Sequence, residues 1–411
     1  MKRLTRHIRD SSRACALTIR SRNLRRAQLS FGAMWAGEWA VMVTIGVVAF
    51  RDGGAAAVGV VGVLRMLPAA LLAPFAATVA DAIRREHVLA GVGFIRTLTL
   101  GASAAVIALD GPLPAVYSLV VVATIPQTLY RPAHSALLPS LCTTPAELTC
   151  ANMTRGLVDS LATLIGPLAA ALLLSLSGTA AAFAACAAAS LLAALLVASL
   201  RYEAPPRMHG AAVGLRDVLD GVQAIFAGSR VLLINSVTAG QTFTRGALSV
   251  LSVVVAIDLL RTGEPGVGIL NGAVGAGAVL GSILVLLLLG HGHLARWFGL
   301  GVALWGLPLA VIGAVPGEAS AIALLAVVGI GNALVDVGAF TLPARLVDES
   351  VMARVFAGFE GILTLGVAAG AAVAPLAIEL LGIRGALVAI GLLARSPRSR
   401  LGPRCGGSTP T

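Results

Sequence analysis

The sequence predicts an all-α protein with many membrane-spanning helices, arranged as two pseudo-symmetric bundles of six. Three observations predict this fold. First, 57% of the 411 residues are hydrophobic and only 12% are charged, which excludes a soluble globular protein. Second, apolar runs of about 20 residues, the length that crosses a hydrocarbon core, follow one another along the chain. Third, the two halves of the chain share a weak repeat.

Eleven apolar runs are long enough to cross a bilayer as helices, which satisfy their own backbone hydrogen bonds in lipid. They cover approximately 29–50, 55–80, 88–109, 115–134, 151–175, 179–200, 232–257, 267–290, 298–315, 320–344 and 356–381. A twelfth begins near Gly385 and stops after about ten apolar residues, which cannot cross unaided. We expect either a short helix supported by bilayer thinning or a chain whose natural end was lost by truncation or frameshift, and the second is favoured.

The breaks between the runs alternate in chemistry. One set is rich in Gly and Pro, as at 51–54, 110–112 and 263–266. The other set carries arginines: the N-terminal tail, Arg84 and Arg85, Arg131, and the stretch 201–230. We therefore interpret the net charge of +11 as a topology signal and not as a nucleic-acid-binding surface. By the positive-inside rule, we expect a multi-pass protein of the inner (plasma) membrane with a cytoplasmic N-terminus.

The polar stretch 201–230 divides the chain into halves that resemble each other. Pro139 and Pro343 align with a shift of about 200 residues, and the segments 166–168 and 374–376 match at nearly the same shift. Duplicated halves with a substrate site between them are typical of secondary transporters. The predicted organisation is a basic cytoplasmic tail (1–26), an N-terminal six-helix bundle (27–200), a cytoplasmic connection (201–230), a C-terminal bundle (231–394) and a basic irregular tail (395–411).

Ionisable side chains within the apolar runs are candidate functional residues, because charge at membrane depth is costly. Glu38 is the most central acid of the first half, and we propose it as a proton-coupling residue. The alternative is a fixed ion pair with Arg65 or Arg96. Arg155 and Asp159 share a helix face at i, i+4 spacing, so mutual neutralisation is expected for them. Further charges within the runs are Arg245, Asp336 and Glu360, and the last two are gate candidates near the cytoplasmic ends.

The stretch AATVADAIRREHVL, between the second and third runs, resembles a loop signature of the major facilitator superfamily. Asp81, Arg84 and Arg85 match the acid and the basic pair that brace neighbouring helices at the cytoplasmic gate of that family. The family's leading glycine is Ala77 here, and its first basic residue is Ala82. The resemblance covers about 27–394 and implies two six-helix bundles that transport a solute by alternating access.

The region around the fourth and fifth runs is similar to the group that includes enterobactin-type siderophore exporters and macrolide efflux proteins. Gly166 and Pro167 resemble the helix-packing motif of drug-exporting members, and Arg354, in ARVFAGFEG, resembles the matching loop of the second half. The residues that carry this resemblance are Pro132, Ala133, Pro139, Ala151, Asn152, Gly166 and Pro167.

No phosphate-binding loop, HExxH or nucleophile elbow is present in the sequence, so we expect no enzyme activity and no cofactor. His291 and His293 are interpreted as loop residues, and no metal site is predicted. The predicted function is proton-coupled export of a small hydrophobic compound, drug-like or siderophore-like, by a monomer in the lipid bilayer. The alternatives are a truncated or degenerate protein without transport activity, and an importer or lipid transporter of the same fold.

Overall fold

The structure is a computed structural model that describes residues 21–202, 229–288, 294–344 and 349–393. Side chains are described throughout these ranges except at 72–82, 229–231, 233, 286–288, 294–295, 337–338, 340–344 and 349–360. All regular elements in the described part are helical. They are α2 (Arg22–Ala82), α3 (Arg85–Ala108), α4 (Leu113–Gln127), α5 (Tyr130–Leu141), α6 (Pro145–Leu176), α7 (Gly178–Ala198), α9 (Ser229–Val254), the π-helical turn η1 (Val255–Leu259), α10 (Gly263–Leu288), α11 (Leu294–Ala314), α12 (Glu318–Ala344) and α13 (Glu349–Leu393).

Two of these helices reverse direction at glycines, so each consists of two antiparallel segments. The 61 residues of α2 would extend about 90 Å as a straight helix, three times the hydrocarbon thickness. Gly53 and Gly54 interrupt them with non-helical backbone angles, and Gly54 has φ 61°, a conformation that favours glycine. Gly382 (φ 70°) interrupts α13 in the same way. The helical segment after Gly382 is about 11 residues long, roughly 16 Å, which confirms that the last helix is short.

The predicted apolar runs are confirmed as helices, and ten helices of the described part are long and apolar enough to cross a membrane. The fourth run differs from the prediction in where it ends and in being interrupted. Its predicted end is residue 134, but the crossing continues through α5 to Leu141 and is interrupted by a turn at 128–129. The error has a physical cause: polar residues such as His134 lower the hydropathy of this segment. His134 is nevertheless fully buried, with Nε2 3.1 Å from the Ala27 carbonyl oxygen.

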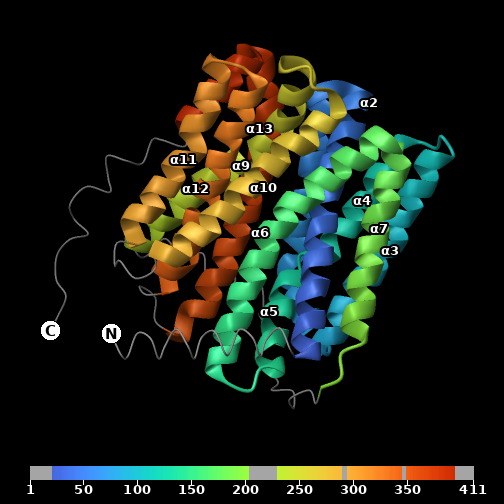
Figure 1. Cartoon of the computed structure of the whole chain (residues 1–411), viewed down its shortest axis with the longest axis vertical. Coiled ribbons are helices and arrows are strands. Elements are labelled where there is room, and N and C mark those ends of the chain that lie inside the picture. The colour runs from blue at the N-terminus through green and yellow to red at the C-terminus, as the bar shows by residue number, and fades with distance from the viewer. Residues whose placement is uncertain (1–20, 203–228, 289–293, 345–348, 394–411) are drawn as a thin grey trace.

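The helices form two bundles, α2–α7 and α9–α13, that stand side by side (Figure 1). The pairings within one bundle repeat those in the other. In the first, α2 packs on α6 and α3 on α7; in the second, α9 packs on α13, and α11 packs on the last segment of α13. Between the bundles, α6 lies along α10, and the second crossing of α2 lies along α13 (Figure 1). This arrangement confirms the predicted fold of two pseudo-symmetric halves.

In the described residues, the halves are in contact from mid-depth, where the Ser160 and Ser282 hydroxyls lie 2.9 Å apart, to one end of the molecule. We call it the turn end, because it holds the reversals at Gly54 and Gly382 and the short loops before α4, α7, α10 and α12. Its inter-half contacts include Gly46 against Val253 and Gly59 against Pro375. The opposite end, the basic end, holds the start of α2 and the loops before α3 and α6. The bundles are therefore joined near the turn end.

Candidate functional site

A triad of buried charges lies at the centre of the first bundle. The carboxylate of Glu38 contacts two guanidinium groups: its Oε1 is 2.8 Å from Nη2 of Arg65, and its Oε2 is 2.8 Å from Nη2 of Arg96. The three residues are 6%, 4% and 0% exposed. Arg65 also donates from Nε to the Thr124 hydroxyl at 3.3 Å, and Arg96 donates to the Ala123 carbonyl at 3.3 Å. The triad therefore joins α2, α3 and α4, with a formal charge of +1.

The fold-back of α2 assembles this triad. Glu38 lies about 22 Å before the reversal at Gly53, and Arg65 lies about 16 Å after it, so the two reach similar depths on neighbouring crossings. Arg96 arrives at that depth on α3, which runs back from the basic end. Of the two sequence-based interpretations of Glu38, the ion-pair geometry is observed, and it includes both arginines. The proton-coupling role remains a proposal.

A second group of charges lies between the halves. On the first half, Arg131 of α5 contacts Asp159 of α6, with Nη2 2.9 Å from Oδ2, and its guanidinium carbon lies 4.8 Å from the centre of the Trp35 ring. On the second half, Arg245 of α9 lies 5.4 Å from the Trp39 ring of α2. This contact crosses from one half to the other and is within the range of a cation–π interaction.

Asp336 of α12 completes this inter-half group. Its side chain is exposed and accepts a hydrogen bond from Asn332 at 2.9 Å. Arg245, Arg131 and Asp159 are all within electrostatic reach of it, although two of them belong to the other half. We define the central cluster as Trp35, Trp39, Arg131, Asp159, Arg245 and Asp336. It carries two cations and two anions on opposing faces of the two bundles.

The expected pairing of Arg155 with Asp159 is not the one observed. Arg131 reaches Asp159 from the neighbouring helix, while Arg155 donates to the Ser135 hydroxyl and lies 5.9 Å from the Phe31 ring. The reason is steric and topological: α5 packs beside α6 and offers a cation directly opposite the carboxylate. Arg131, expected in a basic break, is instead the second residue of α5.

The predicted cytoplasmic gate motif lies in the turn between α2 and α3. Arg84 forms an ion pair with Glu86 at 2.6 Å, and Arg85 donates to the Ala136 carbonyl of α5 at 3.1 Å. The Tyr202 hydroxyl donates to Glu86 at 2.6 Å, and burial together with this carboxylate raises the pKa of Tyr202. Tyr202 therefore stays a hydrogen-bond donor, which ties the end of the first bundle to this turn. The side chain of Asp81 lies outside the described residues.

Gly166 and Pro167 lie where α6 passes between α2 and α10. A Cβ on Gly166 would overlap the Ala36 carbonyl of α2, so glycine permits the close approach. The Pro167 carbonyl faces Gly268 of α10 in the other half. Gly166 therefore contacts α2 of its own bundle, while the neighbouring Pro167 contacts α10 of the other bundle.

Two of the second-half candidates cannot be placed by their side chains. Arg354 and Glu360 lie in α13, but their side chains are outside the described residues, as are His291 and His293. In the part of the chain that the structure describes, no three His, Cys, Asp or Glu residues lie close enough to hold a metal ion.

The sequence analysis missed a latch at the turn end, where Arg51 forms a bidentate ion pair with Glu264 of the other half. Nη1 of Arg51 also donates to the Thr179 hydroxyl at 3.3 Å, and the neighbouring Asp52 accepts from Tyr117 at 2.8 Å. Opposite charges in two Gly-rich turns were the available signal. Trp35 and Trp39 were missed because tryptophans in an apolar run are indistinguishable from packing residues.

Cysteines in place of Arg51 and Glu264 are expected to be joined by a short bis-methanethiosulfonate cross-linker, because the two long side chains meet at their tips across the closed turn end. The cross-link between the two introduced cysteines would be detected as a shift in gel mobility that a reductant reverses. Each single-cysteine variant is the control for the native cysteines, of which Cys142 is the least buried in the described part. No cross-link in the double variant would show that the halves do not meet here.

No family profile and no curated protein matches the sequence. Solved structures do match over nearly the whole chain. A single-residue variant of the nucleoside transporter NupG superposes with a TM-score of 0.73, covering 91% of this chain and 97% of that one at 15% identity. The chain has the major facilitator fold. A POT family transporter bound to 5-aminolevulinic acid (TM-score 0.70, 14% identity, 90% and 94% covered) has it too.

The human organic anion transporter MFSD10 shares this fold with the chain, with a TM-score of 0.67, 15% identity and coverage of 91% and 98%. The major facilitator fold predicted from the loop motifs is thus confirmed at the level of architecture, and the chain is a multi-pass membrane protein. The enterobactin-exporter and macrolide-efflux subgroup has no counterpart among these structures and stays a proposal.

Proposed function

We propose that the protein is a secondary active transporter that exports a small, mostly hydrophobic compound in exchange for protons, by alternating access. The observation that carries the proposal is the central cluster: charged and aromatic side chains of both halves face one another, while the halves are joined near the turn end. Charged residues at membrane depth are retained where they serve a solute path. Transporters with this fold, such as the organic anion and nucleoside transporters above, support the same class of function.

The positive-inside rule places the basic end in the cytoplasm. With that orientation, the outer side would be closed by the contacts of α6 with α10 and of α2 with α13, and by the latch of Arg51 and Glu264. Export requires that the latch open while the basic end closes. The turn around Arg84 and Arg85, where Arg85 joins α3 to α5, would form part of the cytoplasmic gate.

The central cluster favours a flat, amphipathic solute. The rings of Trp35 and Trp39 offer apolar area with defined geometry, and Arg131 and Arg245 already lie over them. A drug-like or siderophore-like compound with an aromatic group would be bound by these rings and oriented by the charges. Both halves contribute to the cluster, so such a solute would bridge them, as alternating access requires.

Glu38 is the proposed proton site. Protonation would remove the only anion of the buried triad and leave Arg65 and Arg96 without a counter-ion, which would drive these guanidinium groups apart. Because the triad joins α2, α3 and α4, that rearrangement would shift these helices relative to one another. The shift would change the position of the first-bundle side chains in the central cluster. Trp39, the residue next to Glu38, lies in the cluster itself.

The test is accumulation in an efflux-deficient bacterial host. Cells that make the protein are expected to hold several-fold less of at least one compound from a panel of dyes, macrolides and siderophores, and a protonophore should remove the difference. Glu38→Gln is expected to abolish this export at an equal amount of membrane protein, whereas Glu38→Asp, which keeps a carboxylate, should retain part of it. Full export by Glu38→Gln would exclude the proton role. No export of any compound would favour a membrane protein without transport activity.

A further inference from the structure

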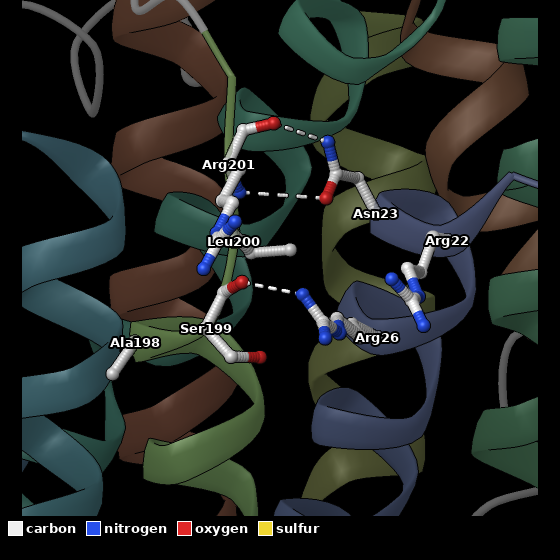
Figure 2. A pocket seen from close by; sticks show the side chains of 7 residues that line it. All are labelled: Arg22, Asn23, Arg26, Ala198, Ser199, Leu200 and Arg201. Carbon is white, nitrogen blue, oxygen red and sulfur yellow. Dashed lines mark hydrogen bonds between the residues drawn. The ribbon is translucent and has the colours of Figure 1, made fainter.

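A cavity of about 340 Å³ lies between the first turns of α2 and the end of α7, on the basic end of the first bundle. Arg22, Asn23 and Arg26 line it from α2, and residues 198–201 line it from the other side (Figure 2). Hydrogen bonds hold its walls together. Asn23 donates to the Arg201 carbonyl at 2.6 Å and accepts from the Arg201 N–H at 3.4 Å, and Arg26 donates to the Ser199 carbonyl at 2.5 Å.

The lining of this cavity is positively charged. Arg22, Arg26 and Arg201 contribute three guanidinium groups, and none of the lining residues is acidic. Among the described residues, no carboxylate forms an ion pair with any of the three; the nearby Glu86 is occupied by Arg84. The first turn of α2 also lacks an acid, and cations at that end of a helix are disfavoured by its dipole. A bound anion would relieve both effects.

Apolar surface begins directly beside the cavity. Leu29, two turns above Arg22 on the same face of α2, is 57% exposed. On α7, Leu192 and Leu195 are each 52% exposed, and they share a helix face with Ser199 of the cavity wall. In a membrane protein, exposed leucines at this level face acyl chains. The cavity therefore sits where the charged surface of the basic end meets the hydrocarbon.

We propose that this cavity binds the phosphate headgroup of an anionic phospholipid from the surrounding leaflet, with the acyl chains along Leu29, Leu192 and Leu195. Basic pockets between helices at the membrane surface are suited to anionic headgroups, and guanidinium groups match phosphate oxygens in charge and geometry. Arg22 and Arg201 supply cations that have no ion-pair partner among the described residues. Arg26 fixes the cavity wall through Ser199. A soluble phosphate would use the same cations but would gain nothing from the leucines.

The test is native mass spectrometry of the purified full-length protein with phosphatidylglycerol, phosphatidylcholine of the same acyl chains, or glycerol 3-phosphate. Retained phosphatidylglycerol is expected, with an affinity at least tenfold above phosphatidylcholine. Arg22→Gln should weaken it about fivefold, the scale expected for one arginine at an anionic surface. Arg25→Gln is the matched control, since Arg25 occupies the same exposed turn without lining the cavity, and it should leave the affinity within twofold.

Three results would overturn the proposal. If phosphatidylcholine bound as tightly as phosphatidylglycerol, the site would not select an anionic headgroup. Equal binding of glycerol 3-phosphate would make the site one for a soluble anion. If Arg22→Gln and Arg25→Gln weakened the affinity for phosphatidylglycerol equally, the lipid would be attracted by the general surface charge and not bound in the cavity. Because both variants keep Arg26 and its bond to Ser199, the cavity wall is intact in each comparison.

Discussion

Replacing Gly275 by valine is expected to open the turn end of the molecule. Gly275 of α10 packs on the backbone of Leu164 in α6, so an added side chain would overlap the other half. Overpacking costs about 1–3 kcal/mol, and the halves can escape it by separating. A penalty of that size would shift the balance between closed and open states by roughly 5- to 150-fold.

A cysteine at Val253 reports this opening, because Val253 is buried against Gly46 of the other half. A reagent that cannot cross membranes should label Val253→Cys slowly by itself and many times faster when Gly275→Val is added. Gly277→Val is the matched control. Gly277 lies two residues away but packs on Ala326 of its own bundle, so its replacement should lower thermal stability without exposing position 253. The same labelling rate with both valines would contradict the inter-half contact.

Glu38→Gln is expected to destabilise the protein more than any other single change in the triad. It leaves two buried guanidinium groups that repel each other, and an uncompensated buried charge costs about 3–5 kcal/mol. Arg96→Gln instead leaves a neutral pair of Glu38 and Arg65, and should cost only about 1–3 kcal/mol for its lost hydrogen bond to Ala123.

Thermal unfolding of the purified variants measures both effects. The double variant Glu38→Gln with Arg96→Gln should be less destabilised than the sum of the single changes, because it removes the repulsion along with the acid. If Arg96→Gln were as damaging as Glu38→Gln, or if the effects simply added, the three side chains would not form one electrostatic unit.

Much of the fold was predictable because the bilayer imposes a simple rule on the sequence. Runs of about 20 apolar residues and Gly-rich breaks such as 51–54 identify the crossings without any knowledge of packing. The rule failed at α5, where His134 and Arg131 interrupt the apolar pattern. These residues are tolerated at depth because partners on other helices, Ala27 and Asp159, satisfy them. Such partners are distant in sequence and leave no local signal.

The candidate site was predictable in part for the same reason. Sequence position alone marked Glu38, Arg65 and Arg96 as buried charges, but whether one arginine or both reached Glu38 depended on the reversal of α2. Helical spacing predicted that Arg155 neutralises Asp159, but it could not reveal the direct ion pair, which Arg131 forms from a neighbouring helix. The latch of Arg51 and Glu264 depends on how the two halves dock, and no periodicity within either half encodes that.

The central claim, proton-coupled transport, is tested most directly in vesicles that contain the purified protein and an imposed pH gradient. With a compound that the cell assay shows to be exported, we expect the pH gradient to drive its movement across the membrane. Movement of the compound should in turn be accompanied by a flow of protons in the opposite direction. Glu38→Gln should lose both fluxes, while Gly277→Val, reconstituted in equal amount, should retain their ratio. Movement of the compound at the same rate with and without the gradient, and with no proton flux, would contradict the account.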